Sequence, residues 1–234
     1  SGSAVSVESA AVETGNSEEN SISQALNSGM YYLKEISVSD SYYLDEEPIP
    51  VQLSYKDAVT PVIYVNCRKE NKQTTNEIDK LSVADSSEIA GCNLVITDAE
   101  GNEIISWTSG DKDSVKVSVT EKDGYCNLKY SFDEKGNLHV GGLLHDKDYT
   151  LTETRPADGY VTADAIVYQI RQKKAEDGSV SSVVSIKQED GTYVDQADDK
   201  TVMVDEQTHI QLLKLDKKSG QALGGAKFVV TDSD

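Results

Sequence analysis

Hydrophobic and polar residues alternate along most of the chain, as expected of strands that turn one face to a core and the other to water. The alternation is clearest at residues 115–119 and 149–153, and short runs of the same kind recur along the sequence. Turn sequences such as AEGNE, EKDG and DEKGN separate these runs. The pattern therefore predicts an all-β protein built as an antiparallel, immunoglobulin-like sandwich, not an α/β fold.

A strand that carries a lysine and leads through a polar turn into a second strand occurs twice. Lys80 is followed by LSVADSSE, Ile89 and AGCNL, and Lys214 is followed by LDKKSGQA, Leu223 and GGAKF. The spacing from the lysine to the apolar residue is the same in both copies. This repetition indicates that one structural unit recurs in the chain.

Two further signatures are repeated. A leucine, a short turn and an aromatic strand precede Glu153 in LHDKDYTLTE and Glu35 in LNSGMYYLKE. A β-branched strand ends at Asp205 in VMVD and at Asn66 in IYVN. Because the three signatures follow one another twice in the same cyclic order, we expect modules in tandem that are cut out of phase.

The order of the signatures divides the chain into four segments. Residues 1–66 would hold the C-terminal part of one module, and residues 67–79 a linker or strand connection. Residues 80–206 would form a complete module, and residues 207–234 the N-terminal part of a following one. The two end segments would together make up one further module, so the chain has the organisation of a repeating unit.

The motifs resemble those of CnaB or SpaA-like domains, the prealbumin-like modules of Gram-positive pilins and surface adhesins. The resemblance is carried by the lysine of the first strand, by LGGA at the start of the second, by LTETRPADGY and by VMVD. It covers nearly the whole chain. It implies tandem CnaB-type sandwiches on the bacterial surface.

The resemblance also implies that an isopeptide bond forms spontaneously in the complete module. On the matching positions, Lys80 is the nucleophile, Asp205 the acceptor and Glu153 the catalytic acid. Burial in an apolar sandwich favours the neutral forms of an amine and of a carboxylic acid. A neutral amine can attack a neutral carboxyl group while Glu153 relays protons. The reaction would run once with loss of water, so we expect no enzyme acting on an external substrate.

The end segments carry the same set of residues, divided between them. Glu35 would be the catalytic acid, Asn66 the acceptor and Lys214 the nucleophile, and an asparagine acceptor would release ammonia. The bond would form between chains or between repeats. After one intervening residue, Glu35 is followed by SVSDSY and Glu153 by RPADGY, and SVSDSY lacks the proline and glycine of the other sequence.

The composition excludes other classes of protein. The formal net charge is −19, from 41 acidic and 22 basic residues, whereas nucleic-acid binding requires a basic surface. No apolar run approaches the roughly 18–20 residues that span a bilayer. The polar, acidic start has no basic n-region, so we expect any export signal or wall anchor to lie outside this chain.

Metal sites and disulfides are not indicated. The three cysteines form no CxxC pair, and we expect Cys92 in the core, while the pairing of Cys67 and Cys126 stays open. The histidines at 139, 145 and 209 show no metal-ligand spacing, so we expect neither a metal nor a cofactor.

The sequence thus predicts an extracellular, wall-associated stalk or shaft module of a surface or pilus-type fibre, whose partners are further copies arranged head-to-tail. An alternative is an adhesin module that binds a host protein or glycan through its loops. The insertion between Trp107 and Gly141 is the candidate for such contacts, and its pattern predicts an extra hairpin.

Overall fold

The computed structural model describes residues 28–54, 65 and 67–231, and the chain divides into two compact units. One unit, here called the N-terminal unit, comprises residues up to Val38 together with Leu44–Asn71. The other, here called the sandwich unit, comprises Ser39–Tyr43 and the chain from Lys72 onward. Its last described part, residues 207–231, is called the tail.

The N-terminal unit contains a hairpin of two antiparallel strands, β1 (Gly29–Leu33) and β2 (Ile49–Leu53). Tyr31 pairs with Val51 and Leu33 with Ile49. Val51 is buried, whereas Leu33 is 38% exposed. The hairpin therefore has an apolar side that the described residues cover only in part.

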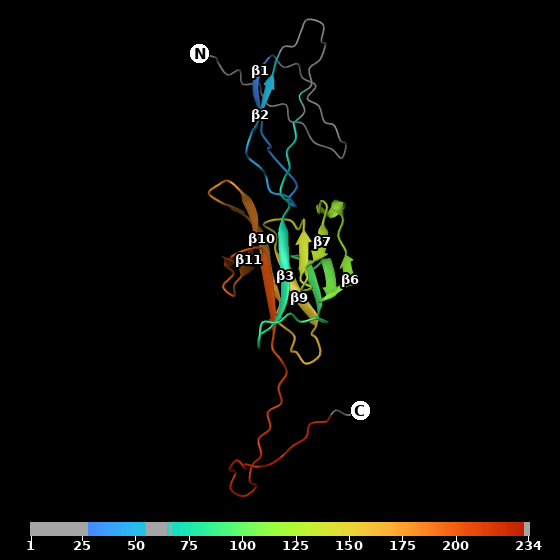
Figure 1. Cartoon of the computed structure of the whole chain (residues 1–234), viewed down its shortest axis with the longest axis vertical. Helices are drawn as coiled ribbons and strands as arrows, with labels where there is room; N and C mark the ends of the chain where they lie inside the picture. Colours follow the sequence, from blue (N-terminus) through green and yellow to red (C-terminus); the bar gives the residue numbers. More distant parts are fainter. Residues whose placement is uncertain (1–27, 55–64, 66, 232–234) are drawn as a thin grey trace. The chain divides into compact units, whose positions relative to one another are not determined.

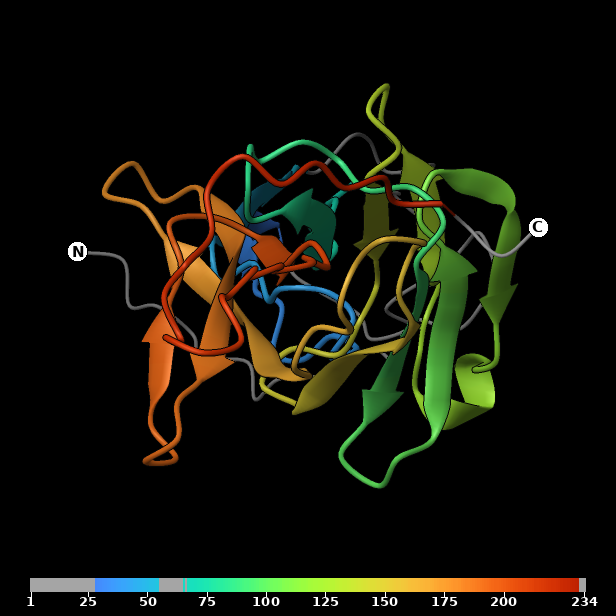
Figure 2. The same cartoon turned by 90° about the horizontal axis from the view of Figure 1, so that it is seen from below.

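The sandwich unit consists of two facing sheets (Figures 1 and 2). In sheet order, the first is formed by β12 (Tyr193–Asp195), β11 (Val180–Lys187), β10 (Ile166–Lys174), β9 (Tyr149–Arg155), β4 (Asn93–Asp98), β5 (Glu103–Thr108) and β6 (Asp111–Val117). The second is formed by β13 (Lys200–Asp205), β3 (Thr75–Ser82), β8 (Leu138–Gly141) and β7 (Lys129–Phe132). The described residues thus confirm the predicted all-β sandwich.

One strand pair departs from the antiparallel pattern. The first strand of the sandwich, β3, pairs with the last strand, β13, in parallel, so that Lys80 lies opposite Met203. All other paired strands of the described residues run antiparallel. Two parallel neighbours need a long connection, and here the rest of the sandwich supplies it.

The core lies between the two sheets and is formed by the inward side chains of the alternating strands. Ile78 and Met203 come from the four-stranded sheet, and Ile96, Leu151 and Ile170 come from the seven-stranded sheet. All five are at most 2% exposed. The period-two pattern of the sequence therefore arises because every second side chain of these strands points into the core between the two sheets.

The sandwich unit also includes the short segment Ser39–Tyr43, which lies in the sequence between the two parts of the N-terminal unit. Tyr42 forms a bridge with Gln73, and the Tyr43 ring is 2% exposed. The Tyr43 hydroxyl lies 2.9 Å from the Ser182 hydroxyl on β11. Burial raises the pKa of Tyr43 to about 12, although the Ser182 hydroxyl acts in the opposite direction. The sequence predictions assigned this segment to the preceding module.

The prediction for the insertion after Trp107 is wrong in one respect. Its strands β6 and β7 do not pair with each other as an extra hairpin would, because β6 extends the seven-stranded sheet and β7 the four-stranded one. A one-turn 3₁₀ helix, Glu121–Asp123, lies between them. The insertion therefore widens both layers of the sandwich on the same side.

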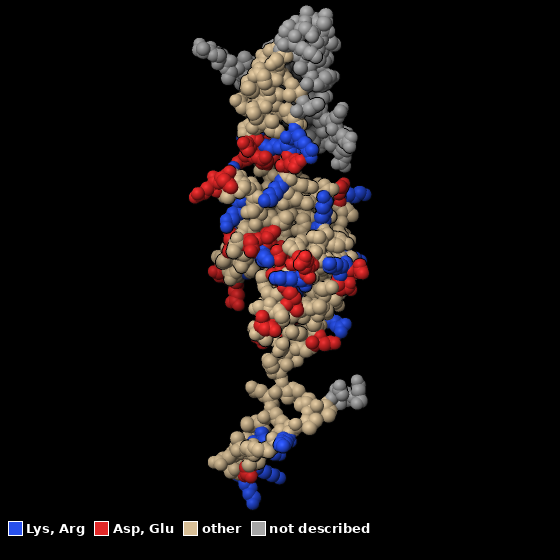
Figure 3. Space-filling view, in the orientation of Figure 1, with Lys and Arg blue, Asp and Glu red and all other residues tan. Residues whose placement is uncertain are grey.

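The first strand begins at Thr75, five residues before Lys80, where the predicted module started. In the tail, the described residues form an isolated bridge between Leu215 and Ala222 and are exposed almost throughout. Acidic and basic side chains are interspersed over the visible face of the sandwich (Figure 3). No helix among the described residues is long and apolar enough to cross a membrane.

The core assignment predicts the effect of removing one inward side chain. Ile96→Ala should lower the free energy of unfolding by about 2–5 kcal/mol, because it leaves a cavity between the sheets. Val194→Ala, at a side chain that is 50% exposed, should change it by less than about 0.5 kcal/mol. Urea unfolding followed by the fluorescence of the buried Trp107 measures both, and equal losses would contradict the assignment.

Candidate functional site

The parallel pairing of β3 and β13 brings a lysine and an aspartate together inside the core. Lys80 and Asp205 both occupy inward positions, since Met203 lies opposite Lys80 and Asp205 is the next inward residue of β13. Their side chains are 3% and 0% exposed. The Lys80 Nζ contacts the Asp205 Oδ1 directly.

Glu153 completes the cluster from the opposite sheet. It lies on β9, and its Oε1 is 3.1 Å from the Lys80 Nζ. Its Oε2 accepts a hydrogen bond of 2.9 Å from the Ala163 N–H, in the loop that follows β9. The Glu153 side chain is fully buried. The three residues that the motifs singled out thus meet at one buried point, although they are far apart in the sequence.

The environment separates the protonation behaviour of the two carboxyl groups. Burial raises the pKa of Asp205 and the charge of Glu153 adds to this, while Lys80 only partly offsets it. Burial also raises the pKa of Glu153, but the Ala163 N–H, Lys80 and Cys92 outweigh it, so its pKa lies below the ordinary value. Asp205 is therefore the more readily neutral acid, and Glu153 is the more readily ionised base.

Cys92 adjoins this cluster and was predicted only as a core residue. It is fully buried, which confirms that prediction. Its Sγ also lies 3.8 Å from the Asp205 Oδ2. Burial raises the pKa of the thiol to about 11, so the thiol stays protonated and can donate to the carboxylate. Its proximity to Asp205 depends on how the sheets face each other, which one strand pattern does not reveal.

The cluster contains three side chains of the kinds that bind metals, Cys92, Glu153 and Asp205. The Lys80 ammonium lies against both carboxylates. It supplies the positive charge that a cation would otherwise provide. The arrangement is therefore that of an amine held against an acid, which suits amide formation better than metal binding.

The residues predicted for the second, divided site lie in different parts of the chain. Glu35 belongs to the N-terminal unit, where its Oε2 accepts a hydrogen bond of 2.9 Å from the Asp45 N–H. Lys214 is exposed in the tail. Asn66 lies outside the described residues.

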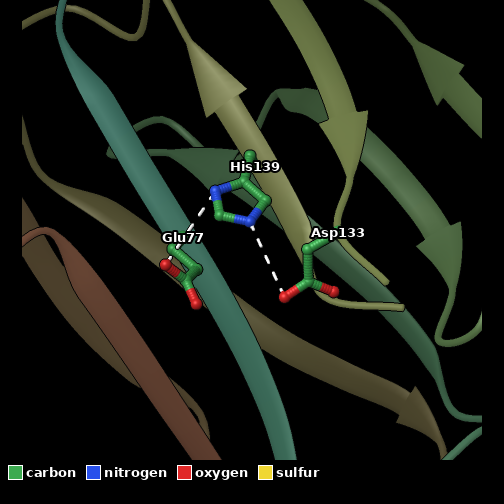
Figure 4. Close-up of side chains that lie close together, drawn as sticks. All are labelled: Glu77, Asp133 and His139. Atoms are coloured by element: carbon green, nitrogen blue, oxygen red, sulfur yellow. Dashed lines mark ion pairs between the residues drawn. The ribbon is translucent and has the colours of Figure 1, made fainter. Parts of the chain in front are cut away.

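A second group of polar side chains lies on the outer face of the four-stranded sheet. The His139 ring points one nitrogen toward Glu77 and the other toward Asp133, at 3.9 Å each (Figure 4). Lys200 also contacts Glu77, at 2.5 Å. The two imidazole nitrogens thus face different carboxylates across the sheet, and we read the group as a surface charge network.

The sequence of residues 74–188 matches the family described as SpaA, a prealbumin-like fold domain. Among solved structures, the Bacillus anthracis TIE protein is similar at 19% identity with a TM-score of 0.38. The shaft pilin SpaA of Lactobacillus rhamnosus GG is similar at 17% identity and a TM-score of 0.34. The major pilin subunit BcpA of Bacillus cereus is similar at 16% identity and a TM-score of 0.30.

The similar regions cover most of this chain but only parts of the other proteins. They span 78% of this chain and 26% of the TIE protein, and 78% of this chain and 66% of the shaft pilin SpaA. For BcpA they span 56% of this chain and 28% of that protein. No curated protein matches the sequence.

The burial of the cluster predicts which cysteines react with an alkylating reagent. Cys67 is exposed and should be alkylated in the folded protein, whereas Cys92 should react only after unfolding, because it is buried and its thiol stays protonated at pH 8. Mass spectrometry of peptides from iodoacetamide-treated protein measures this. Alkylation of Cys92 at the rate of Cys67 would show that the cluster is open to solvent.

Proposed function

We propose that the chain, whose residues 74–188 form a SpaA-type domain of prealbumin-like fold as the sequence motifs predicted, is a structural module of a bacterial surface or pilus-type fibre. We propose further that an isopeptide bond between Lys80 and Asp205 stabilises it. The buried contact of Lys80 with Asp205 and Glu153 is the observation that carries this proposal. The module is extracellular and associated with the cell wall. Its chemistry is a single self-modification, so it is not an enzyme.

The proposed reaction balances without any external reagent. Glu153 removes a proton from the Lys80 ammonium, and the neutral Nζ attacks the Cγ of the protonated Asp205. The Nζ–Cγ bond forms and one Cγ–O bond breaks. The leaving hydroxyl takes up a proton, which Glu153 relays from the nitrogen, and departs as water. The product is a neutral amide.

The fold supports this reaction by holding the reacting atoms together and by excluding water from them. The reacting atoms are held together by strands β3 and β13, and such positioning corresponds to effective molarities of roughly 10⁵–10⁸ M. The surrounding core excludes water, which would hydrate the amine and the carboxyl groups. The raised pKa of Asp205 and the lowered pKa of Glu153 shift each carboxyl group toward the protonation state that its role requires.

The strand topology gives the bond a mechanical role. Because β13 runs parallel to β3, the chain enters the sandwich at the start of β3 and leaves at the end of β13, at opposite ends of the strand pair. Tension along the fibre would therefore shear the two strands past each other. A Lys80–Asp205 bond would pass this load directly from β3 to Asp205 and leave the residues between them unloaded.

The alternative function, binding of a host ligand through loops, is less well supported. A surface pocket of about 620 Å³ lies between the β4–β5 turn and the insertion. Two of its carboxylates close turns of the chain: Asp98 accepts the N–H groups of Glu100 and Asn102, and Asp123 accepts that of Thr120. Since these two acidic groups already have partners within the protein, we favour the structural function.

The proposal extends to the parts on either side of the domain. We take residues 1–66 as the C-terminal part of one neighbouring module, joined through residues 67–79 to the complete module at 80–206. Residues 207–234 follow directly as the N-terminal part of the next module. The fibre would then be a tandem array in which further copies follow one another head-to-tail.

The intact mass of the protein tests the bond. The purified chain should be lighter than its sequence by one water, and Lys80→Ala or Glu153→Ala should each have the full mass of its sequence. Lys200→Ala is the matched control, because this lysine lies on the outer face of β13 and should leave the mass deficit in place. A wild-type chain of full mass would refute the proposed bond.

Single-molecule stretching tests the mechanical role. Lys80 and Asp205 are 125 residues apart in the sequence. At 3.3–3.6 Å per residue, unfolding of Lys80→Ala should release about 410–450 Å of chain that the wild type keeps closed. If the wild type extended by the same length as the variant, the bond would not carry the load.

A further inference from the structure

The turn after Lys214 in the tail has the same hydrogen bonds as the turn after Lys80 in the sandwich. The Lys80 carbonyl accepts the Ile89 N–H at 2.8 Å, and the Lys214 carbonyl accepts the Leu223 N–H at 2.8 Å. The bridges inside these turns also correspond, Leu81 with Glu88 and Leu215 with Ala222. The repeated lysine signature thus folds into the same turn in both places.

The backbone conformation repeats as well. Ser86 adopts a left-handed conformation with φ of 57°, and the corresponding Gly220 has φ of 69°. Gly91 and the corresponding Gly225 have φ of 92° and 78°. A serine at φ of 57° is uncommon, and glycine takes up this conformation without strain. The turns of the tail therefore have the same backbone conformation as those at the start of the sandwich.

The tail differs from the sandwich in what covers its apolar residues. Ile78 and Leu94 are each 2% exposed in the core, whereas the corresponding Leu212 and Phe228 are 62% and 53% exposed. A tail with this pattern would bury these side chains against the later strands of a module of the same kind.

The N-terminal unit has the local structure of those later strands. In its hairpin Leu33 pairs with Ile49, as Leu151 pairs with Ile166 between β9 and β10. The next inward pairs also correspond, Tyr31 with Val51 and Tyr149 with Tyr168. The hairpin β1–β2 therefore has the register of β9–β10.

The glutamate of the N-terminal unit is held in the same way as Glu153. The Glu35 Oε2 accepts the N–H of Asp45, ten residues further along, at 2.9 Å. The Glu153 Oε2 accepts the N–H of Ala163, also ten residues further along and also at 2.9 Å. The loop after Glu35 thus closes on its carboxylate although it lacks the proline and glycine of the other copy.

An asparagine occupies the place of Asp205 beside Glu35. The Asn71 Nδ2 donates to the Glu35 Oε1 and Oε2 at 2.7 and 2.8 Å. Asn71 precedes Lys80 by nine residues, as Asp205 precedes Lys214, and the dipeptide Gln-Thr follows each of them after one residue. Both the contact and the spacing thus indicate Asn71, whereas the strand motif had indicated Asn66.

We propose that Glu35 and Asn71 form a second isopeptide site, and that the tail of a second copy of this chain fills it and supplies Lys214 as the nucleophile. This inference rests on the proposed function of the Lys80 cluster and extends it to an intermolecular bond. Glu35 and Asn71 are half-buried, whereas Glu153 and Asp205 are buried. The incoming strands of the tail complete the burial.

Strand register specifies how the tail docks. In the sandwich β4 pairs with β9, so that Leu94 lies opposite Glu153 and Ile96 opposite Leu151. By correspondence, Phe228 lies opposite Glu35 and Val230 opposite Leu33. The tail adds beside β1 as a further antiparallel strand, which is the common mode of β-augmentation.

The charges of the two parts are complementary. The tail contains four lysines and one aspartate between residues 207 and 231, in a chain whose net charge is −19. Basic side chains gather on this segment in Figure 3. The first 38 residues contain five glutamates and one lysine. Attraction between a basic tail and an acidic N-terminal part speeds their encounter and weakens with added salt.

The covalent step balances with ammonia as the leaving group. The neutral Lys214 Nζ attacks the Asn71 Cγ, the Nζ–Cγ bond forms and the Cγ–Nδ2 bond breaks. Glu35 takes the proton from the attacking nitrogen and passes it to Nδ2. The products are an amide that joins two chains and one molecule of ammonia.

Two complementary full-length variants test the proposal. Asn71→Ala keeps the donor tail but lacks the acceptor, and Lys214→Ala keeps the acceptor but lacks the nucleophile. Each alone should remain a single chain on a denaturing gel after boiling. Mixed, they should give a covalent dimer that is lighter than the sum of the two chains by one ammonia, with tandem mass spectrometry placing the link between Lys214 and Asn71.

Matched variants sharpen the test. Asn66→Ala added to the acceptor chain should leave dimer formation unchanged. In the donor chain, Phe228→Asp should abolish it, whereas Val229→Asp, whose counterpart Val95 is only partly buried, should preserve it. A link that maps to Asn66, a dimer that forms when both chains carry Asn71→Ala, or no dimer at all would overturn the proposal. The water lost by each single chain reports the Lys80–Asp205 bond separately, so the two proposals can fail independently.

Discussion

The parallel pairing of the first and last strands of the sandwich is the constraint on which the rest depends. It places Lys80 beside Asp205 in the core, and the facing sheet brings Glu153 to the same point. The same pairing sends the chain in and out at opposite ends, so that load along the proposed fibre would fall on these two strands. One topological feature thus brings the site residues together and, in the proposed fibre, would set the direction of force on them.

The buried cluster explains why a covalent bond suits this position. A lysine with two carboxylates in an apolar core loses its hydration, and buried ion pairs of this kind contribute little or negative net stability. Conversion of Lys80 and Asp205 to an amide removes both ionisable groups. Glu153 keeps the Ala163 N–H as a hydrogen-bond donor. The buried ion pair is unfavourable, so its conversion to an amide would stabilise the folded protein.

Much of the sandwich could be predicted from sequence because its physical origin is local. Alternating side chains indicate strands, and turn residues separate them. The pairing partners of the insertion strands could not be predicted. The alternating pattern of β6 and β7 is compatible with the edge of either sheet, so it does not reveal which sheet each strand joins. The site residues were found through motifs, whereas the proximity of Cys92 to Asp205 depends on the packing of one sheet on the other.

The divided site illustrates the same limit. The motif IYVN pointed to Asn66 because a β-branched strand ending in an amide resembles VMVD. The contact between Asn71 and Glu35 points elsewhere, and it agrees with the spacing from each acceptor to the following lysine. For the proposed divided site we therefore base the choice of Asn71 on its hydrogen bond to the glutamate, which a strand pattern alone does not reveal.

The most direct test of the central claim is a high-resolution crystal structure of the purified chain. It should show continuous electron density between the Lys80 Nζ and the Asp205 Cγ, at the amide C–N distance of about 1.33 Å, with Glu153 beside the new bond. An ammonium and a carboxylate separated by an ordinary hydrogen-bond distance would contradict it.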